Sequence, residues 1–304
     1  MRYVAVLIVV LCATSAFAQD WVAAMRSVHA QFKGTPNTLG RWGDSITSTS
    51  AFFSNLQYAQ SNVGPEAAPA LNWLRTQMAP GLWSSYGVAH GSTGGSQASW
   101  ALASDVAPPM RNIDYWLATD KPEMVVILWG TNEAKNGTSV ATYRANLTEV
   151  VRTCKANGTI PILTTPPPQH NRNMVPYVDA VNAIAGIEQV PVIDYYNAIL
   201  SRNPGTSWDG YPVYTANPGA YNNNVYAVTT LISGDGIHPS NPSAYTSNFS
   251  ADALSKNGYN LRNYVTLLKA YEVYQAVIVP EPGTVALLAL GSLALLRRRS
   301  GSTA

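Results

Sequence analysis

Short runs of apolar residues recur along the chain, and turn-forming residues follow each run. The runs do not alternate with polar residues, as a strand with one face in water would, so they predict strands that are buried on both faces. Strands of that kind form parallel sheets covered by helices. The runs are TLGRWG at 38–43, YGVAHG at 86–91, MVVILWG at 124–130, TIPILTTP at 159–166 and VPVIDYY at 190–196.

Helical patterns fall between these runs, as a parallel sheet requires. Residues 138–157 carry apolar side chains at helical spacing, and residues 174–189 form a second such segment. A third helix is predicted over residues 241–257, with Gly258 as its stop. Alternating strands and helices predict an α/β fold, a three-layer α/β/α sandwich around a parallel sheet of about five strands.

Two longer stretches, residues 55–85 and 203–233, fit this alternation poorly. Long insertions of this kind in a compact domain tend to carry function. We therefore expect them to form walls of a site.

The N-terminal segment reads as a signal peptide. A basic Arg2 is followed by an apolar run and by an Ala-Phe-Ala cleavage site that ends at Ala18. Residues 1–18 are therefore predicted to be removed on export. Attachment of a lipid at Cys12 is the alternative, and the bulky Leu11 before it argues against this reading.

The C-terminal segment reads as a second sorting signal. A Pro-Glu-Pro turn at 280–282 precedes an apolar run over 284–296 and three arginines at 297–299. The run would span roughly 20 Å as a helix, against about 30 Å for a hydrocarbon core. The arrangement resembles the PEP-CTERM sorting signal of Gram-negative bacteria. That resemblance implies recognition by membrane sorting machinery, removal of the tail and release to the cell surface or exterior. A retained short transmembrane anchor is the alternative.

Composition is consistent with one exported domain, residues 19–276, followed by a tail at 277–304. The 304 residues are 46% hydrophobic and 12% charged, which suits one sizeable core. The net charge is +2, and the only basic cluster lies in the tail, so no nucleic-acid partner is expected. Once residues 1–18 are removed, Cys154 is the only cysteine, so no internal disulfide can form, and its helical position predicts a core thiol.

Chemistry-bearing residues follow the predicted strands. Ser45 follows the first strand, and Asp235 and His238 share a turn late in the chain. Because the carboxyl ends of parallel strands gather at one edge of the sheet, these residues are expected in one cleft. An aspartate three residues before a histidine can hold the imidazole Nδ1 proton while Nε2 faces a serine. The alternative is that Ser45 only caps a helix.

The other histidines lack this arrangement. His29, His90 and His170 have no carboxylate three positions earlier; His90 is a candidate for the cleft, and the other two are expected at the surface. No cluster of His, Cys and carboxylate residues has metal-ligand spacing, so neither a metal nor another cofactor is predicted.

The segments GDSIT, GTNE and DGIHP, in this order, resemble blocks I, III and V of the SGNH (GDSL-type) hydrolase family over nearly the whole mature domain. The resemblance implies a flavodoxin-like fold, Ser45 as nucleophile, His238 as general base and Asp235 as its orienting partner. It also implies an oxyanion hole made by the Ser45 N–H, a glycine N–H and the Asn132 side chain. The glycine block departs from the family pattern: Gly94 fits best by spacing, and Gly91 and Gly95 remain open.

The expected function is an exported serine esterase that cleaves O-acyl esters, in particular O-acetyl esters, on a polysaccharide through an acyl-Ser45 intermediate. Glu133 stands where the family usually has aspartate, a variation associated with carbohydrate-active members. Residues 211–226 combine tyrosines with amides, which suits sugar rings, although the tyrosines could equally pack along a long loop. The alternatives are a lipid esterase, arylesterase or thioesterase, or a surface glycan-binding protein without turnover.

Overall fold

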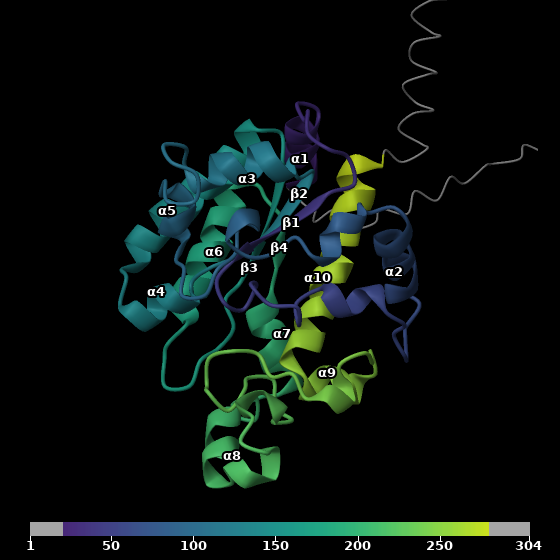
Figure 1. Ribbon diagram of the computed structural model, residues 1–304, viewed down its shortest axis with the longest axis vertical. Coiled ribbons are helices and arrows are strands. Elements are labelled where there is room, and N and C mark those ends of the chain that lie inside the picture. The colour runs from purple at the N-terminus through teal and green to yellow at the C-terminus, as the bar shows by residue number, and fades with distance from the viewer. Residues whose placement is uncertain (1–20, 280–304) are drawn as a thin grey trace, which may run out of the picture.

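The structure is a computed structural model that describes residues 21–279 (Figure 1). The predicted signal peptide and the apolar run at 284–296 lie outside the described residues. Across residues 21–279, none of the helices combines the length and the apolar character that crossing a bilayer would need.

The centre of the fold is a parallel sheet in the order β1-β2-β3-β4. In register, Leu39 pairs with Met124, and Met124 pairs with Ile160. All residues of the first three strands are buried, as their mainly apolar runs predict, and Arg41 of β1 is buried with them. The α/β class with a parallel sheet is thus confirmed. The strands are β1 (Leu39–Gly43), β2 (Met124–Leu128), β3 (Ile160–Thr164) and β4 (Val192–Ile193).

The described residues form four strands rather than about five. The run at 86–91 folds instead around a 3-10 helix, η3 (Val88–His90), and only the single pair Gly43 and Ser92 extends the sheet there. Gly87 and Gly91 adopt φ of +97° and +88°, which breaks an extended strand. Val88 is 48% exposed, so this apolar run is not a core strand.

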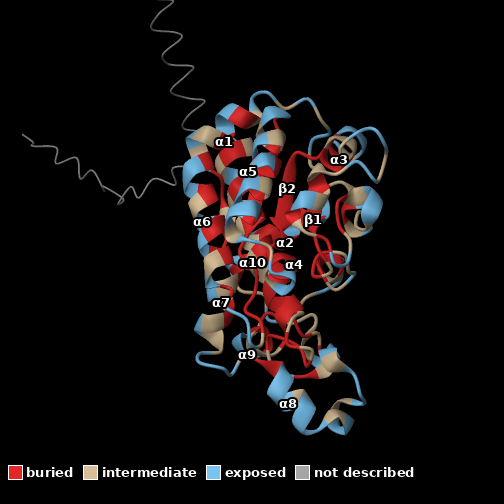
Figure 2. Ribbon diagram, turned by 90° about the vertical axis from the view of Figure 1, so that its left-hand side faces the viewer, coloured by how far each residue is buried: buried red, intermediate tan, exposed pale blue. Residues whose placement is uncertain are grey.

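Helices cover both faces of the sheet and bury it, as the red strands in Figure 2 show. One face carries α3, α5 and α6, and the other carries α1 and α10, with α2 and α7 packed on α10. The helices are α1 (Trp21–His29), α2 (Ala67–Thr76), α3 (Asn112–Asp120), α4 (Thr131–Asn136), α5 (Val140–Ala156), α6 (Val175–Glu188), α7 (Tyr195–Arg202), α8 (Gly210–Ala216), α9 (Ala251–Lys256) and α10 (Gly258–Val273), with 3-10 segments η1 (Ser54–Gln57), η2 (Pro80–Trp83), η4 (Ala98–Leu102), η5 (Pro218–Tyr221), η6 (Val225–Ala227) and η7 (Ser243–Tyr245) and a π-helical segment η8 (Tyr274–Ile278).

Two of the three predicted helices are present as α5 and α6, and Cys154 is buried on α5, where burial raises the pKa of its thiol. The third prediction, a helix over 241–257 that stops at Gly258, holds only in part, because α9 and the short η7 are the only helical segments in that described range. Asn257 ends α9 as predicted, but it also accepts a hydrogen bond from the Asn260 N–H and begins α10 at Gly258. Gly258 is required there because a Cβ would lie 2.0 Å from the Leu231 carbonyl oxygen.

The two insertions behave differently. Most of residues 55–85 forms α2 and its flanks, which pack on α10. Residues 203–233 form α8 and the short helices after it, which project at the lower end of Figure 1, beyond the carboxyl ends of the strands. This end of the sheet is where the candidate site lies.

Candidate active site

Ser45 lies in a tight turn directly after β1. Asp44 is fully buried, its Oδ1 accepts the Ile46 N–H at 2.9 Å, and its carbonyl accepts the Ser48 N–H at 2.9 Å. Gly43 enters this turn at φ +155°, where a Cβ would lie 2.3 Å from the Leu128 carbonyl oxygen. No helix begins at Ser45 in the described chain, so the helix-cap interpretation of this serine is wrong.

Asp235 and His238 lie in a turn that Asp235 itself organises. Its Oδ1 accepts hydrogen bonds from the Ser233 hydroxyl at 2.7 Å and from the N–H groups of Ile237 and His238 at 2.8 and 2.9 Å. Its Oδ2 lies 2.6 Å from His238 Nδ1. His238 Nε2 in turn lies 2.8 Å from Ser45 Oγ. The predicted three residues therefore form one hydrogen-bonded chain.

The charges in this chain are set by burial and pairing. Burial alone would favour a neutral Asp235, but the hydrogen bonds from His238 and Ser233 outweigh it and hold the pKa of Asp235 at about 2. Burial also disfavours the imidazolium form of His238, but the hydrogen bond and charge of Asp235 raise the pKa of His238 above its usual value. A carboxylate at Asp235 therefore holds the proton on Nδ1 and leaves Nε2 to accept the Ser45 hydroxyl proton.

Of the three candidate glycines, Gly94 lies beside Ser45. A Cβ on Gly94 would come within 3.9 Å of Ser45 Cβ, which is ordinary contact. Gly91 has another task, because a Cβ there would lie 2.1 Å from the Trp42 indole. The geometry favours Gly94 as the glycine that lines the space in front of the serine.

Asn132 is held close to the same turn through Ser96. Asn132 Nδ2 donates to the Ser96 carbonyl at 3.0 Å, and the Ser96 hydroxyl donates to the Gly43 carbonyl at 3.1 Å. An amide nitrogen carries two hydrogens, and the second has no protein partner among residues 21–279. Ser96 was not predicted, because only the fold brings it between β1 and α4.

Glu133 joins the two segments that carry the candidate oxyanion donors. It is buried, its Oε1 accepts the Ala98 N–H at 2.6 Å, and its Oε2 accepts the Gly130 N–H at 2.8 Å. Burial raises the pKa of Glu133 to about 7. Glu133 is thus part of the scaffold that positions Asn132, and it makes no contact with the Ser45–His238 pair.

Comparison with known families agrees with this arrangement. A model of the GDSL-like lipase/acylhydrolase family matches residues 42–243, and a model of the PEP-CTERM protein-sorting motif matches residues 279–300. The chain belongs to the GDSL-like lipase/acylhydrolase family. It is a carboxylic ester hydrolase, and its sorting motif indicates export and surface sorting.

Several solved structures resemble this esterase at low identity. A lipase/acylhydrolase from Enterococcus faecalis is 19% identical, with 75% of this chain and 92% of that chain covered and a TM-score of 0.42. An acetylxylan esterase from Geobacillus stearothermophilus is 16% identical, with 78% and 95% covered and a TM-score of 0.45. An esterase from Pseudoalteromonas sp. is 14% identical, with 78% and 97% covered and a TM-score of 0.47. No curated protein matches the chain.

Arg262 supports the Ser45 turn of the esterase from the buried side, where α10 lies. This fully buried side chain of α10 donates to the Ile46 carbonyl at 2.6 Å and to the Thr47 hydroxyl at 2.9 Å, and its Cζ lies 3.6 Å from the centre of the Phe52 ring. Burial lowers its pKa to about 10, so it stays charged at neutral pH. Neither Arg262 nor α10 was predicted; the helical spacing of residues 258–273 is the signal that could have found them.

The other histidines of the esterase all pair with carboxylates: His29 Nε2 with Glu123 at 2.9 Å, His90 Nδ1 with Asp120 at 2.9 Å and His170 Nδ1 with Asp209 at 2.6 Å. None of the three hydrogen-bonds a serine hydroxyl among the described residues. His170, expected at the surface, is partly buried, and its backbone N–H donates to the Gly236 carbonyl at 2.8 Å and so supports the catalytic turn.

The pH dependence of hydrolysis is expected to report His238. A general base works as the neutral imidazole, so kcat/KM should rise with pH and reach half its maximum at the raised pKa of His238, above the usual value near 6.5. The measurement is kcat/KM for p-nitrophenyl acetate from about pH 5 to about pH 9. Glu133→Gln is the control, because the pKa of Glu133 also lies in this range. If the rise of kcat/KM with pH disappears in Glu133→Gln, that rise reports Glu133 instead of His238.

Replacing Asn132 by alanine is expected to slow the reaction without weakening substrate binding. If Asn132 stabilises the oxyanion only in the transition state, kcat should fall by on the order of 10²-fold and KM should change little. Asn136→Ala, at an exposed position on the same helix, is the matched control. An equal loss in both variants, or a rise in KM alone, would contradict this role.

Proposed function

We propose that the chain is an exported serine esterase that removes O-acyl groups, in particular O-acetyl groups, from a polysaccharide. The observation that carries the proposal is the hydrogen-bonded chain from Ser45 Oγ through His238 to Asp235. We further propose that residues 19–276 are the catalytic domain and that residues 277–304 are a tail that directs sorting.

In the proposed reaction, His238 Nε2 takes the Ser45 hydroxyl proton while Oγ attacks the ester carbonyl carbon. The Ser45 and Gly94 N–H groups and the Asn132 amide stabilise the oxyanion. The tetrahedral intermediate then expels the sugar hydroxyl, which receives its proton from His238, and acyl-Ser45 remains. A water molecule, deprotonated by His238, attacks that acyl group; His238 then returns the proton to the departing Ser45 Oγ, which releases the carboxylic acid and restores the serine. Asp235 stays ionised throughout and stabilises the imidazolium.

Fewer tyrosines of the insertion at 211–226 are available to a carbohydrate substrate than the sequence predicts. Tyr214 packs against Tyr221 with ring centres 6.2 Å apart, and Tyr211 stacks on His170 at 4.2 Å, so these rings largely stabilise the insertion. Tyr226 differs, because its ring lies edge-on 6.0 Å from the His238 ring and is 37% exposed. This position supports a contact between Tyr226 and the alcohol portion of the substrate.

The positions of the chain ends also support a polymer outside the membrane. The Arg26 Nε on α1 donates to the Ala276 carbonyl at 2.8 Å, so both ends of the described chain lie together, at the top of Figure 1. From Gly258, near the catalytic turn, α10 runs about 24 Å toward this end. This separation between the C-terminal end of the described chain and the catalytic turn favours a polymer over membrane lipid as the substrate.

The test is substrate preference. Purified protein should hydrolyse p-nitrophenyl acetate faster than the butyrate and octanoate esters, and it should release acetate from acetylated xylan. A preference for octanoate with no acetate release would favour a lipid esterase of the same family. Absence of hydrolysis on every ester by correctly folded protein would favour a glycan-binding protein without turnover.

A further inference from the structure

A hollow is lined by the segments that follow Ser45 and His238 in the chain. It has a volume of about 630 Å³, within the range of small-molecule sites, and its walls come from residues 49–58, 83–86 and 241–246. Thr49 is four residues from Ser45, and Asn241 is three from His238. Each residue extends the chain by at most about 3.6 Å. The wall of residues 49–58 therefore begins within about 14 Å of Ser45, and the wall of residues 241–246 begins within about 11 Å of His238.

The lining of this hollow is uncharged. Its lining residues include no Asp, Glu, Lys, Arg or His, and Ala51 is the only aliphatic one. Such a surface suits neither an anionic ligand nor an acyl chain. Aromatic rings and amides stand together instead, a combination that stacks on sugar rings and hydrogen-bonds their hydroxyls. The residues concerned are Tyr58, Trp83, Tyr86, Asn55, Gln57 and Asn241.

Several of these groups have unused hydrogen-bonding capacity. Within residues 21–279, the side-chain amide of Asn55 and the hydroxyls of Tyr58 and Tyr86 make no hydrogen bond to protein. Asn241 uses only its Oδ1, which accepts from Asn257 Nδ2 at 3.1 Å. The hollow therefore presents both donors and acceptors to a ligand.

The walls are tied together by buried contacts. The Ser54 hydroxyl donates to the Trp83 carbonyl at 2.9 Å. The fully buried Arg41 donates to the Phe52 carbonyl at 2.8 Å, and its Cζ lies 5.1 Å from the centre of the Tyr86 ring. These contacts hold the backbone at Trp83 and the ring of Tyr86 against the segment that follows Ser45, so a ligand would meet a preformed surface.

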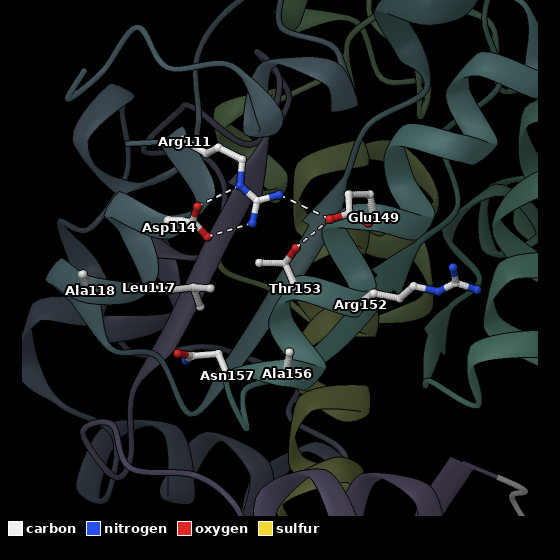
Figure 3. A pocket seen from close by; sticks show the side chains of 9 residues that line it. All are labelled: Arg111, Asp114, Leu117, Ala118, Glu149, Arg152, Thr153, Ala156 and Asn157. Atoms are coloured by element: carbon white, nitrogen blue, oxygen red, sulfur yellow. Dashed lines mark hydrogen bonds and ion pairs between the residues drawn. The ribbon is translucent and has the colours of Figure 1, made fainter. Parts of the chain in front are cut away.

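The hollow between α3 and α5 differs from this one because charged side chains line it and aromatic side chains do not (Figure 3). Arg111 binds Asp114 through Nε at 2.7 Å and Glu149 through Nη1 at 3.2 Å, so its charges are already paired. No aromatic residue lines it. It therefore offers a ligand neither a free charge nor a stacking surface.

We propose that the hollow formed by residues 49–58, 83–86 and 241–246 is a subsite for the uncharged sugar chain that carries the ester. The sugar rings stack on Trp83 and Tyr86, and their hydroxyls bond Asn55, Tyr58 and Asn241. This inference rests on the proposed function, and it adds that the polymer is neutral and that its backbone is held on the side of residues 49–58.

The test compares a substrate that fills the subsite with one that does not. In the full chain, the double variant Asn55→Ala with Tyr58→Ala should lower kcat/KM for acetylated xylo-oligosaccharides by about tenfold. The reason is that the hydrogen bonds lost with these two side chains together correspond to about a tenfold change in binding. Hydrolysis of p-nitrophenyl acetate should change less than about twofold. Tyr58 is 63% exposed, so its removal should not disturb folding, and Ile187→Ala on α6, also 63% exposed, is the matched control. Trp83→Ala, checked by thermal melting, is a second variant.

The outcomes separate the subsite from the proposed function. Wild-type protein that cleaves p-nitrophenyl acetate but no acetylated polysaccharide would overturn the carbohydrate substrate itself. Normal activity of the subsite variants on xylo-oligosaccharides that the wild type cleaves would overturn the subsite alone, as would equal loss on both substrates by a folded variant. Preference of the wild type for acetylated pectin, an anionic polymer, would overturn the neutral ligand.

Discussion

Ser45→Ala is expected to reduce kcat by on the order of 10⁴- to 10⁶-fold while the protein stays folded. The Ser45 hydroxyl is the only oxygen nucleophile that the described structure places against His238 Nε2, at 2.8 Å. Without it, His238 can at best activate water, which has no fixed position for attack. The hydroxyl does not hold the turn together, since Asp44 does so through the N–H of Ile46 and Ser48.

The measurement is single-turnover and steady-state hydrolysis of p-nitrophenyl acetate, with thermal melting to show that the fold is intact. Ser48→Ala removes a hydroxyl from the same turn and is the matched control. Residual activity above about one per cent in Ser45→Ala would show that another group performs the attack.

Asp235→Asn is expected to cost on the order of 10⁴-fold in kcat, although it changes almost no volume. An asparagine can keep its Oδ1 in place to accept from Ser233, Ile237 and His238, so the turn should survive. Its Nδ2, however, would face His238 Nδ1 and donate to it. The imidazole proton would then sit on Nε2, which could no longer accept the Ser45 hydroxyl proton.

The same change also removes the charge that raises the pKa of His238, so the acid limb of kcat/KM should move to lower pH. Asp252→Asn is the control, because it makes the same chemical change at an exposed ion pair with Lys256 on α9. A small loss of kcat with no shift of the limb would mean that Asp235 only stabilises the turn.

The Asp235–His238 half of the catalytic chain was predictable because it is local, whereas the approach of Ser45, 193 residues away, was predictable only from its place at the end of a parallel strand. Asp235 and His238 share one turn, so a spacing of three residues already places a carboxylate near Nδ1. The buried strands were predictable for a similar reason, since β2 and β3 are mainly apolar runs and β1 departs from this pattern only at Arg41. Backbone conformation was harder to predict: the apolar run at 86–91 is not a strand because two glycines turn the chain.

Supporting residues depend on contacts between distant segments, which spacing does not encode. Ser96 joins Asn132 to the end of β1, Glu133 joins α4 to Ala98, and Arg262 reaches the Ser45 turn from α10. Their backbone partners are chemically alike all along the chain, so no pattern of residue types could identify them.

The sequence by itself determined the parallel α/β class, the family and the candidate residues Ser45, Asp235, His238 and Asn132, because hydrophobic periodicity and short motifs are written in neighbouring positions. Only the tertiary structure showed that Gly94, which spacing favoured, lies beside Ser45 while Gly91 packs against Trp42, and that the segments after Ser45 and His238 line one uncharged hollow. Both results depend on how segments far apart in the chain pack, and packing is a property of the whole fold.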